Sequence, residues 1–234
     1  MELQVAVAKV SKYAVSESGD TLEIVERPHG GLSVVLADGQ GSGRAAKDLS
    51  NLVAKKAVSL LADGVRDGAV ARAVHDFLYH YRHGQVSATL NIVSADLSTR
   101  TIVISRNNPS PALVSVNGEV LVLAETATSI GMHRRAKPTI AELPLEATTY
   151  VLVYTDGVDT AGRRYGRSID LIALLQAAAS RRADPRTLAD EVLARAIELD
   201  EGRPNDDMSV VVLAVLPVRT RDEARRLFVQ FPLR

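Results

Sequence analysis

Three short runs rich in valine, isoleucine and leucine open the chain and predict β-strands. They cover residues 3–10, 21–26 and 32–37. Turn-forming residues separate them, such as Ser18-Gly19-Asp20 and the stretch from Pro28 to Gly31. The first part of the chain is therefore expected to build sheet structure.

Two stretches with a 3.6-residue apolar period follow and predict amphipathic helices. The first runs from Ala45 to about residue 61, and the second covers residues 69–81. Gly64 and Gly84 stand where helices are expected to end.

The rest of the chain is predicted to form a run of strands, then two helices and a last strand. Strand patterns cover residues 87–97, 100–105, 111–116, 118–124, 148–155 and 208–216. Asn117-Gly118 is a strong hairpin signal between two of them. A loop is expected around residues 131–138, and helices over 169–178 and from the capping residue Asp184 to Leu199.

Strands linked by hairpins and grouped apart from paired helices favour an α+β fold, in which helices pack on the faces of antiparallel sheets. We expect one domain over residues 1–218 and a tail over 219–234 that could form a short amphipathic helix. No internal repeat or linker interrupts this pattern.

Composition narrows the function classes. Hydrophobic residues make up 46% of the 234 residues, enough for a sizeable core. Basic and acidic residues number 28 each, so no positive excess suggests a nucleic acid or a membrane surface as partner. The chain has no cysteine, which excludes disulfides and thiolate chemistry. No signal peptide or membrane span is apparent, and we expect a cytoplasmic protein.

Three apolar strands each carry an aspartate at one end. Residues 32–37 lead into Asp38-Gly39, residues 150–155 lead into Asp156-Gly157, and Asp206 comes just before the strand at 208–216. A buried strand end is a costly place for a charge without a partner, and no lysine or arginine is adjacent in sequence. If these ends converge, they require a polycation.

Divalent metal ions are the natural candidates, because carboxylates favour magnesium, manganese or calcium. Gly39 and Gly157 would give the backbone conformations barred to other residues, so that a carbonyl could reach an ion. An isolated Asp-Gly is more often a simple turn, and the three together carry the argument. The glycine-rich stretch over residues 39–43 also suggests a phosphate cradle, although it lacks the ending of a nucleotide P-loop.

At these residues the sequence resembles the metal-dependent protein phosphatases (the PPM or type 2C family), and most of all the bacterial SpoIIE-like branch. The matching pieces occur in family order between residues 18 and 215. They are Ser18-Gly19-Asp20, the stretch from Ala37 to Gly43, Ala88-Thr89-Leu90, the stretch from Tyr154 to Val158, and the stretch from Asn205 to Val212.

The resemblance implies a four-layer α-β-β-α sandwich, two antiparallel sheets flanked by helix pairs. It also implies two metal ions, Mn²⁺ or Mg²⁺, and a metal-bridging hydroxide that attacks phosphorus. By motif position Asp38 would bridge the ions, the Gly39 carbonyl would bind one, and Asp156 and Asp206 would hold the other. Asp20 would act nearby, directly or through a water.

The implied substrate is a phosphoserine or phosphothreonine of a bacterial regulatory protein, an anti-anti-sigma or stressosome protein of the STAS type.

Two positions depart from the family pattern. Gln40 stands where many members outside this branch have a histidine, so a metal-bound water is the expected proton donor. Asp159 stands after Asp-Gly-Val, and we favour a turn residue over an accessory ligand.

Two other function classes stay open from the sequence. One is a metal-dependent phosphohydrolase of small phosphate esters, whose site chemistry would be the same. The other is an inactive phosphatase-like module that only binds a regulator. The presence of all the expected acids favours an enzyme.

Overall fold

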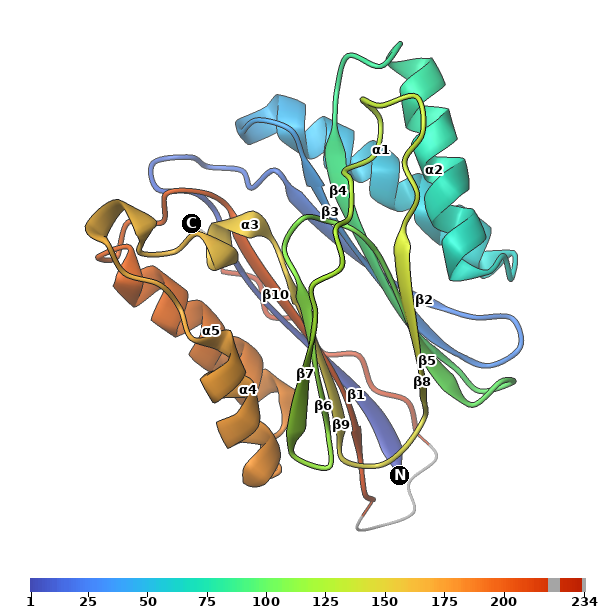
Figure 1. The fold of residues 1–234 in the computed structure, drawn as a ribbon, viewed down its shortest axis with the longest axis vertical. Coiled ribbons are helices and arrows are strands. Elements are labelled where there is room, and N and C mark those ends of the chain that lie inside the picture. Colours follow the sequence, from blue (N-terminus) through green and yellow to red (C-terminus); the bar gives the residue numbers. More distant parts are fainter. Residues whose placement is uncertain (219–223, 233–234) are drawn as a thin grey trace.

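The computed structural model describes residues 1–218 and 224–232. This part of the chain forms two antiparallel five-stranded sheets stacked face to face (Figure 1). Sheet A contains, in spatial order, β1 (Glu2–Val10), β10 (Met208–Leu216), β9 (Thr149–Tyr154), β6 (Ala112–Val116) and β7 (Glu119–Leu123). Sheet B contains β2 (Asp20–Glu26), β3 (Gly31–Gly39), β4 (Ala88–Asp96), β5 (Thr101–Asn107) and β8 (Thr139–Pro144).

A pair of helices covers the outer face of each sheet (Figure 1). Helices α1 (Gly43–Ala62) and α2 (Asp67–Tyr81) pack on sheet B. Helices α4 (Leu171–Ser180) and α5 (Pro185–Leu199) pack on sheet A. The expected four-layer α-β-β-α sandwich is confirmed.

Three apolar layers hold the sandwich together, and alternation along the strands assigns residues to them. In β3, Val34 and Leu36 point into the layer between the sheets, where they join Leu213 of β10. Val35 of the same strand points the other way, toward α1 and α2. A third layer lies between sheet A and helices α4 and α5. Both faces of each central strand are thus buried, which explains why these strands are apolar along their whole length.

Local capping rules set the helix ends as expected. The Asp184 carboxylate accepts a hydrogen bond from the Thr187 backbone N–H at 3.0 Å, and Pro185 occupies the first turn of α5. Gly64 follows α1 with φ of 82°, a conformation that glycine adopts without strain.

Three elements were not predicted. Strand β8 lies at the edge of sheet B, with Ile140 and Glu142 exposed and Thr139, Ala141 and Leu143 half-buried. Its apolar residues fall on both faces, so no hydrophobic alternation marks it. The short helix α3 (Asp156–Asp159) follows β9 directly, so Asp156 begins a helix besides following a strand. A single 3₁₀ turn, Arg163–Tyr165, comes next.

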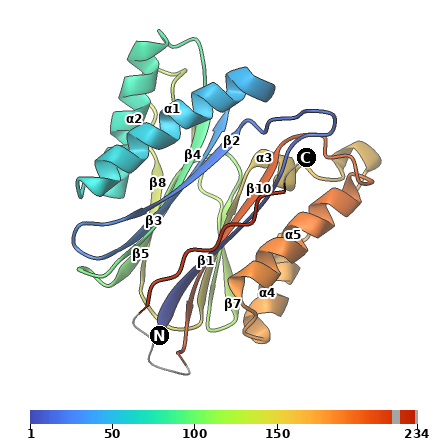
Figure 2. The same ribbon diagram turned by 180° about the vertical axis from the view of Figure 1, so that it is seen from behind.

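The C-terminal segment crosses the side of the sandwich where edge strands β1 and β2 lie (Figure 2). Arg225 forms an ion pair with Glu26 of β2 at 2.6 Å, and Arg186 of α5 contacts Gln230 at 3.5 Å. The segment therefore contacts both halves of the sandwich through polar side chains.

The predicted tail helix can be compared with the structure only in part. Part of it falls on residues 219–223, which lie outside the described residues, and residues 224–232 contain no helix or strand. The domain boundary at residue 218 stays a prediction.

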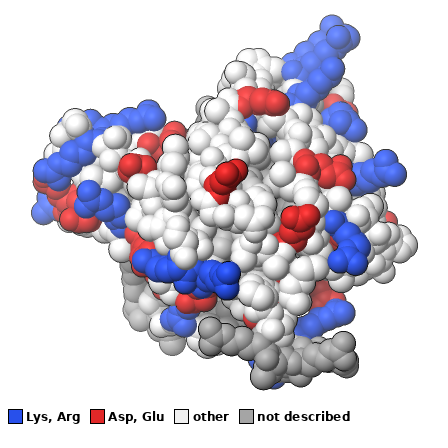
Figure 3. Space-filling view, turned by 60° about the horizontal axis from the view of Figure 1, so that its bottom comes forward, with Lys and Arg blue, Asp and Glu red and all other residues white. Residues whose placement is uncertain are grey.

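Positive and negative side chains are interspersed on the face seen in Figure 3, in agreement with the formal net charge of zero. Within the described ranges, no helix has the length and apolar character needed to cross a membrane.

Candidate metal centre

The acid-bearing strand ends meet at one end of the sandwich. Asp20 opens β2, and Asp38 lies near the end of β3, directly opposite it in the antiparallel register. Cross-strand partners point to the same face of a sheet, with Cβ atoms about 5 Å apart. This face is the one that carries Leu36 into the layer between the sheets. Both carboxylates therefore point toward sheet A.

Sheet A contributes acids at the same end. Tyr154 at the end of β9 is paired with Val210 near the start of β10. Asp156 follows the first strand and Asp206 precedes the second, so the two aspartates flank adjacent strand ends. Asp156 is exposed and Asp206 is half-buried, which leaves this side of the site open to solvent.

Asp38 is at the electrostatic centre of the group. Burial first, and then the negative charges of Asp20, Asp156, Asp206 and Asp207, raise the pKa of its carboxyl group to about 9. Within the described residues its carboxylate accepts no hydrogen bond that would offset this repulsion. The structure thus places the four aspartates that the sequence predicted at one end of the sandwich, near enough for the charges of the other three to act on Asp38.

Asp20 is fully buried and connects the two sheets. Its Oδ2 atom accepts hydrogen bonds from Ser209 Oγ at 2.5 Å and from Thr155 Oγ1 at 3.1 Å. Ser209 belongs to β10 of sheet A, and Thr155 directly follows β9 of the same sheet. Burial raises the Asp20 pKa to about 6, and the Ser209 hydrogen bond and the charge of Lys9 partly oppose that shift. The other oxygen, Oδ1, is buried without a hydrogen-bond partner. Such an orphaned carboxylate oxygen is costly unless a cation or water satisfies it.

Two lysines near Asp20 were missed by the sequence reasoning. The ammonium groups of Lys9 in β1 and Lys47 in α1 each donate to the Asp20 main-chain carbonyl at 2.6 Å. Burial first, and then the charge of Lys47, lower the pKa of Lys9 to about 8. Neither lysine is adjacent to the acids in sequence, so only the tertiary fold reveals the contact.

The consecutive residues Asp206 and Asp207 have different surroundings. Asp207 is 4% exposed and accepts hydrogen bonds from the backbone N–H groups of Lys12 and Gly19, both at 2.8 Å. It fixes the segment that leads into Asp20. Asp206 accepts only the N–H of Asp207, at 2.9 Å, within the described residues. Its carboxylate therefore stays available for a ligand.

The glycines are needed for a reason other than the one expected. Neither Gly39 nor Gly157 has a positive φ, so the expected unusual backbone conformation is wrong at both positions. A Cβ atom at Gly39 would instead overlap the carbonyl oxygen of Ala46 in α1. At Gly157 it would overlap the carbonyl oxygen of Asp207. Close backbone packing is what requires glycine here.

The donor chemistry fits hard divalent cations. Carboxylate oxygens are the ligands that Mg²⁺ and Mn²⁺ prefer, and the orphaned Asp20 Oδ1 together with the raised pKa of Asp38 marks a place where positive charge is favourable. No three carboxylate or imidazole side chains in the described ranges form a ready-made group around one point.

Gln40, the departure from the family pattern, has a local role. Its backbone N–H donates to the Ser87 carbonyl at 3.0 Å, and its Oε1 accepts from the Ser87 N–H at 2.9 Å. The side chain therefore fastens the segment after Gly39 to the segment before β4.

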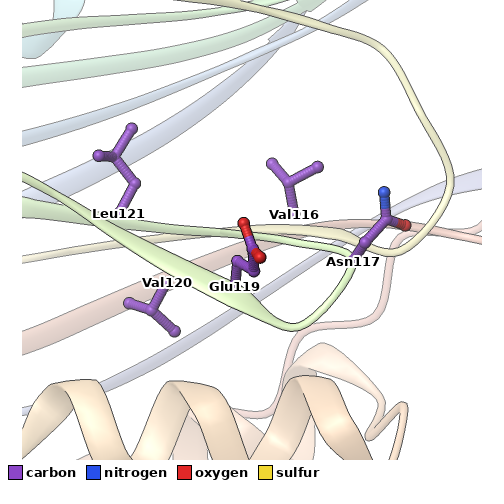
Figure 4. Close-up of a pocket in the computed structure, with 5 residues that line it drawn as sticks. All are labelled: Val116, Asn117, Glu119, Val120 and Leu121. Atoms are coloured by element: carbon purple, nitrogen blue, oxygen red, sulfur yellow. The ribbon is translucent and has the colours of Figure 1, made fainter.

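A surface depression of about 600 Å³ lies elsewhere, on the β6–β7 hairpin (Figure 4). Val116 of this hairpin pairs with Thr149, at the end of β9 opposite to Asp156. The lining side chains carry one carboxylate, Glu119, and Val120 points away from Leu121 toward the helix layer. The depression therefore does not take part in the acidic site.

Comparisons with known proteins agree with this arrangement. The PP2C phosphatase domain of the cell fate determinant SpoIIE from Bacillus subtilis, solved with a fragment of its regulatory domain, has a TM-score of 0.78 and 21% identity; the match covers 92% of this chain and 64% of that one. RsbX in complex with magnesium has a TM-score of 0.68 and 15% identity, covering 90% and 94%. A chain from a structure of the bacterial stressosome also has a TM-score of 0.68, with 17% identity, covering 91% and 100%. The fold is thus that of PP2C-type phosphatases.

The family follows from the sequence match. The family model for Stage II sporulation protein E (SpoIIE) matches residues 28–216, so this chain belongs to the SpoIIE family. Stage II sporulation protein E of Priestia megaterium is 20% identical over 206 residues, which are 88% of this chain and 35% of that protein. The chain therefore spans about a third of the length of this relative.

Proposed function

We propose that this protein is a metal-dependent phosphatase that hydrolyses phosphoserine or phosphothreonine on a regulatory protein in the bacterial cytoplasm. The single observation that carries the proposal is the group of aspartates around Asp38, at the end of a PP2C-type sandwich. Chemistry on a phosphate dianion at an acidic site requires cations, because otherwise like charges repel.

The proposed ligands are the residues predicted from the sequence. Asp38 would lie between two ions, the Gly39 carbonyl would bind one of them, and Asp156 and Asp206 would hold the other. Asp20 would contribute its orphaned Oδ1 atom, directly or through a water. When bound, the Mn²⁺ or Mg²⁺ ions would supply an activated hydroxide and neutralise charge on the transferring phosphoryl group.

The protein's own residues would prepare the site. Ser209 and Thr155 hold Oδ2 of Asp20 and so leave the other oxygen free. Lys9 and Lys47 fix the main chain at the same residue. These contacts would keep one carboxylate oriented before any ion binds.

The open side of the site would admit the substrate. Asp156 at the start of α3 is exposed, whereas Asp20 on the opposite sheet is fully buried. A phosphorylated side chain of another protein could therefore enter past α3 and reach the buried acids.

The substrate class rests on the relatives. One structural neighbour is the phosphatase domain of a cell fate determinant, and another comes from the bacterial stressosome. Both support a regulatory protein as substrate, and we favour a phosphorylated protein of the STAS type. The balanced charge of the chain supports a protein over a nucleic acid.

The test compares kcat/KM at saturating Mn²⁺ on a phosphorylated STAS-type protein, a phosphotyrosine peptide, nucleotides and sugar phosphates. We expect the phosphoserine protein to be hydrolysed at least about a hundredfold more efficiently than the others. Equal or faster hydrolysis of nucleotides or sugar phosphates would replace the proposal with a small-ester phosphohydrolase. No hydrolysis of any of them would indicate a binding module.

A further inference from the structure

A group of exposed basic residues lies beside the acidic site and has no role in the arrangement described above. We call it the basic shoulder, and it is built from the end of α2 and the loop between β7 and β8. Its members are Arg82, His83, His133, Arg134, Arg135 and Lys137, all exposed. None of the four lysine and arginine side chains forms an ion pair within the described residues.

The register of sheet B places the base of the shoulder near the site. Gly39 is paired with Ala88 of β4, and Ala88 exchanges two backbone hydrogen bonds with Ile130, at 3.0 and 2.9 Å. Ile130 therefore lies two strand spacings, about 10 Å, from Gly39. The exposed tip, residues 132–135, begins two residues later.

The loop is held firmly at its base. His75 is buried in α2, and its Nδ1 atom accepts a hydrogen bond from the Gly131 N–H at 3.1 Å. Gly131 has φ of 96° and packs so closely on Leu78 that a Cβ atom there would clash. Ala136 is 6% exposed and anchors the far side of the tip. The basic side chains are thus presented from a fixed base.

We propose that the basic shoulder is a docking surface for acidic residues that flank the phosphorylated serine or threonine of the protein substrate. This inference rests on the proposed phosphatase function. A phosphoryl group would occupy the metal centre, and carboxylates of the substrate that reach beyond Ile130, itself about 10 Å from Gly39, would meet Arg134, Arg135 and their neighbours. Exposed cations that form no ion pair within the described residues fit a partner that carries acidic residues at the matching place.

The shoulder acts on encounter and binding, not on the chemical step. Charges at the rim of an interface change association rates and their salt dependence. Docking therefore lowers KM for an acidic protein or peptide. In contrast, kcat and the hydrolysis of a small ester depend on the aspartates alone.

The experiment uses synthetic phosphoserine peptides of equal length, with four glutamates or four lysines beginning three residues from the phosphoserine. Three extended residues span about 10 Å, the distance from Gly39 to Ile130 at the base of the shoulder, and the four charged residues then continue toward its tip. We expect the wild-type protein to have a KM about tenfold lower for the glutamate peptide, and this preference to vanish in about 1 M NaCl, where the Debye length is about 3 Å. Equal KM values at low salt would overturn the proposal, and this arm needs no variant.

The variant Arg134→Glu/Arg135→Glu should remove or invert the preference and leave p-nitrophenyl phosphate turnover unchanged. The control is Arg66→Glu/Arg72→Glu, with the same change in charge at two exposed arginines that form no ion pair within the described residues. Arg66 precedes the first turn of α2, so the helix rise separates it from Arg82 by about 24 Å. A control with the same loss of preference would show a general charge effect and overturn the docking site.

Binding separates this proposal from the phosphatase proposal. A fluorescein-labelled, unphosphorylated glutamate peptide is titrated with metal-free protein, and its anisotropy is followed. Binding to the wild type that Arg134→Glu/Arg135→Glu abolishes supports the shoulder even if no peptide is hydrolysed. Hydrolysis of all peptides without any flank preference, and no binding, would leave the phosphatase intact and refute the shoulder.

Discussion

Two of the aspartates in sheet B, Asp96 and Asp38, lie at opposite ends of its buried strands and have opposite surroundings. Asp96 ends β4, and its Oδ1 accepts hydrogen bonds from the Ser98 and Thr99 backbone N–H groups at 2.8 and 3.2 Å. Arg27 lies 3.7 Å from its other oxygen. Asp38, near the end of β3, accepts none within the described residues and faces other aspartates.

The difference separates a structural carboxylate from one that we propose as a metal ligand. Asp96 has its donors within the turn that it closes, as an aspartate in a turn normally does. The charges that act most strongly on Asp38 are like charges, which is unfavourable for the fold by itself. Such an arrangement indicates a site built for a cation that the protein does not supply.

Replacing Asp38 and replacing Asp96 should therefore have opposite effects on the stability of the metal-free protein. The replacement of Asp38 should have the largest effect on activity. Asp38→Asn removes the proposed bridging charge, so kcat should fall by about a thousandfold or more on a phosphoserine substrate. The chelated variant should melt above the chelated wild type, because one member of the repelling group is neutral. Circular dichroism melts and steady-state rates measure both, and an active Asp38→Asn protein would refute the assignment.

The neighbouring pair Asp206 and Asp207 sharpens the same distinction. Asp206→Asn should also inactivate the enzyme, since its carboxylate is a proposed ligand. Asp207→Asn should retain most activity and lose about 1 kcal/mol of stability, because an amide oxygen can still accept one of the two backbone hydrogen bonds. Rates and chemical denaturation of the two variants test this. The reverse result, with Asp207→Asn inactive and Asp206→Asn active, would shift the ligand assignment by one residue.

The stability of the metal-free protein should fall as pH rises, because the folded state raises the pKa values of Asp38 and Asp20. Burial and the neighbouring charges raise the folded pKa of Asp38 to about 9, and burial raises that of Asp20 to about 6, above their unfolded values near 4. The folded state then holds more protons than the unfolded state between these limits. For these groups, stability is therefore greatest below about pH 4 and is lost as pH rises toward 9.

Thermal melts in chelator between about pH 5 and pH 9 check this prediction. The melting temperature should decrease with pH in the wild type and decrease less in Asp38→Asn. A melting temperature that rises steadily over this range in the metal-free wild type would contradict the account. Saturating Mn²⁺ should reduce the dependence, since it binds the charged carboxylates.

The smallest effect on activity is expected at Asp96. Asp96→Ala removes two backbone hydrogen bonds from an exposed turn and one ion-pair partner from Arg27, and should cost about 1 to 2 kcal/mol of unfolding free energy. Activity per folded molecule should not change. Chemical denaturation and rate measurements on the same preparation test this, and a large loss of kcat would remove the contrast with Asp38.

Much of the fold could be predicted because its strands and helices have strong local patterns. The buried strand β10 is apolar at nearly every position, and Asp184-Pro185 marks the start of α5. Asn117 and Gly118 both have positive φ between β6 and β7, as the hairpin signal predicted. Strand β8 could not be found, since an edge strand with Ile140 exposed has no clear alternation. Local periodicity is informative only where one face is much more buried than the other.

The placement of the four aspartates at one end of the sandwich could be predicted, but their environment could not, and their role as metal ligands stays a prediction. Asp38 is marked by its place at the end of an apolar strand. The hydrogen bond between Ser209 and Asp20 joins residues 189 positions apart, and the contact of Lys47 with Asp20 depends on how α1 packs on sheet B. Packing between sheets and helices sets such contacts, and no short-range pattern in the sequence encodes them.

We predict that the aspartates around Asp38 work only with divalent cations. The most direct measurement follows phosphate release from a phosphoserine protein before and after removal of metal with excess chelator, and then after addition of Mn²⁺ or Mg²⁺. We predict complete loss of activity on chelation and recovery with Mn²⁺ at least as good as with Mg²⁺. Undiminished phosphate release in excess chelator would contradict the claim.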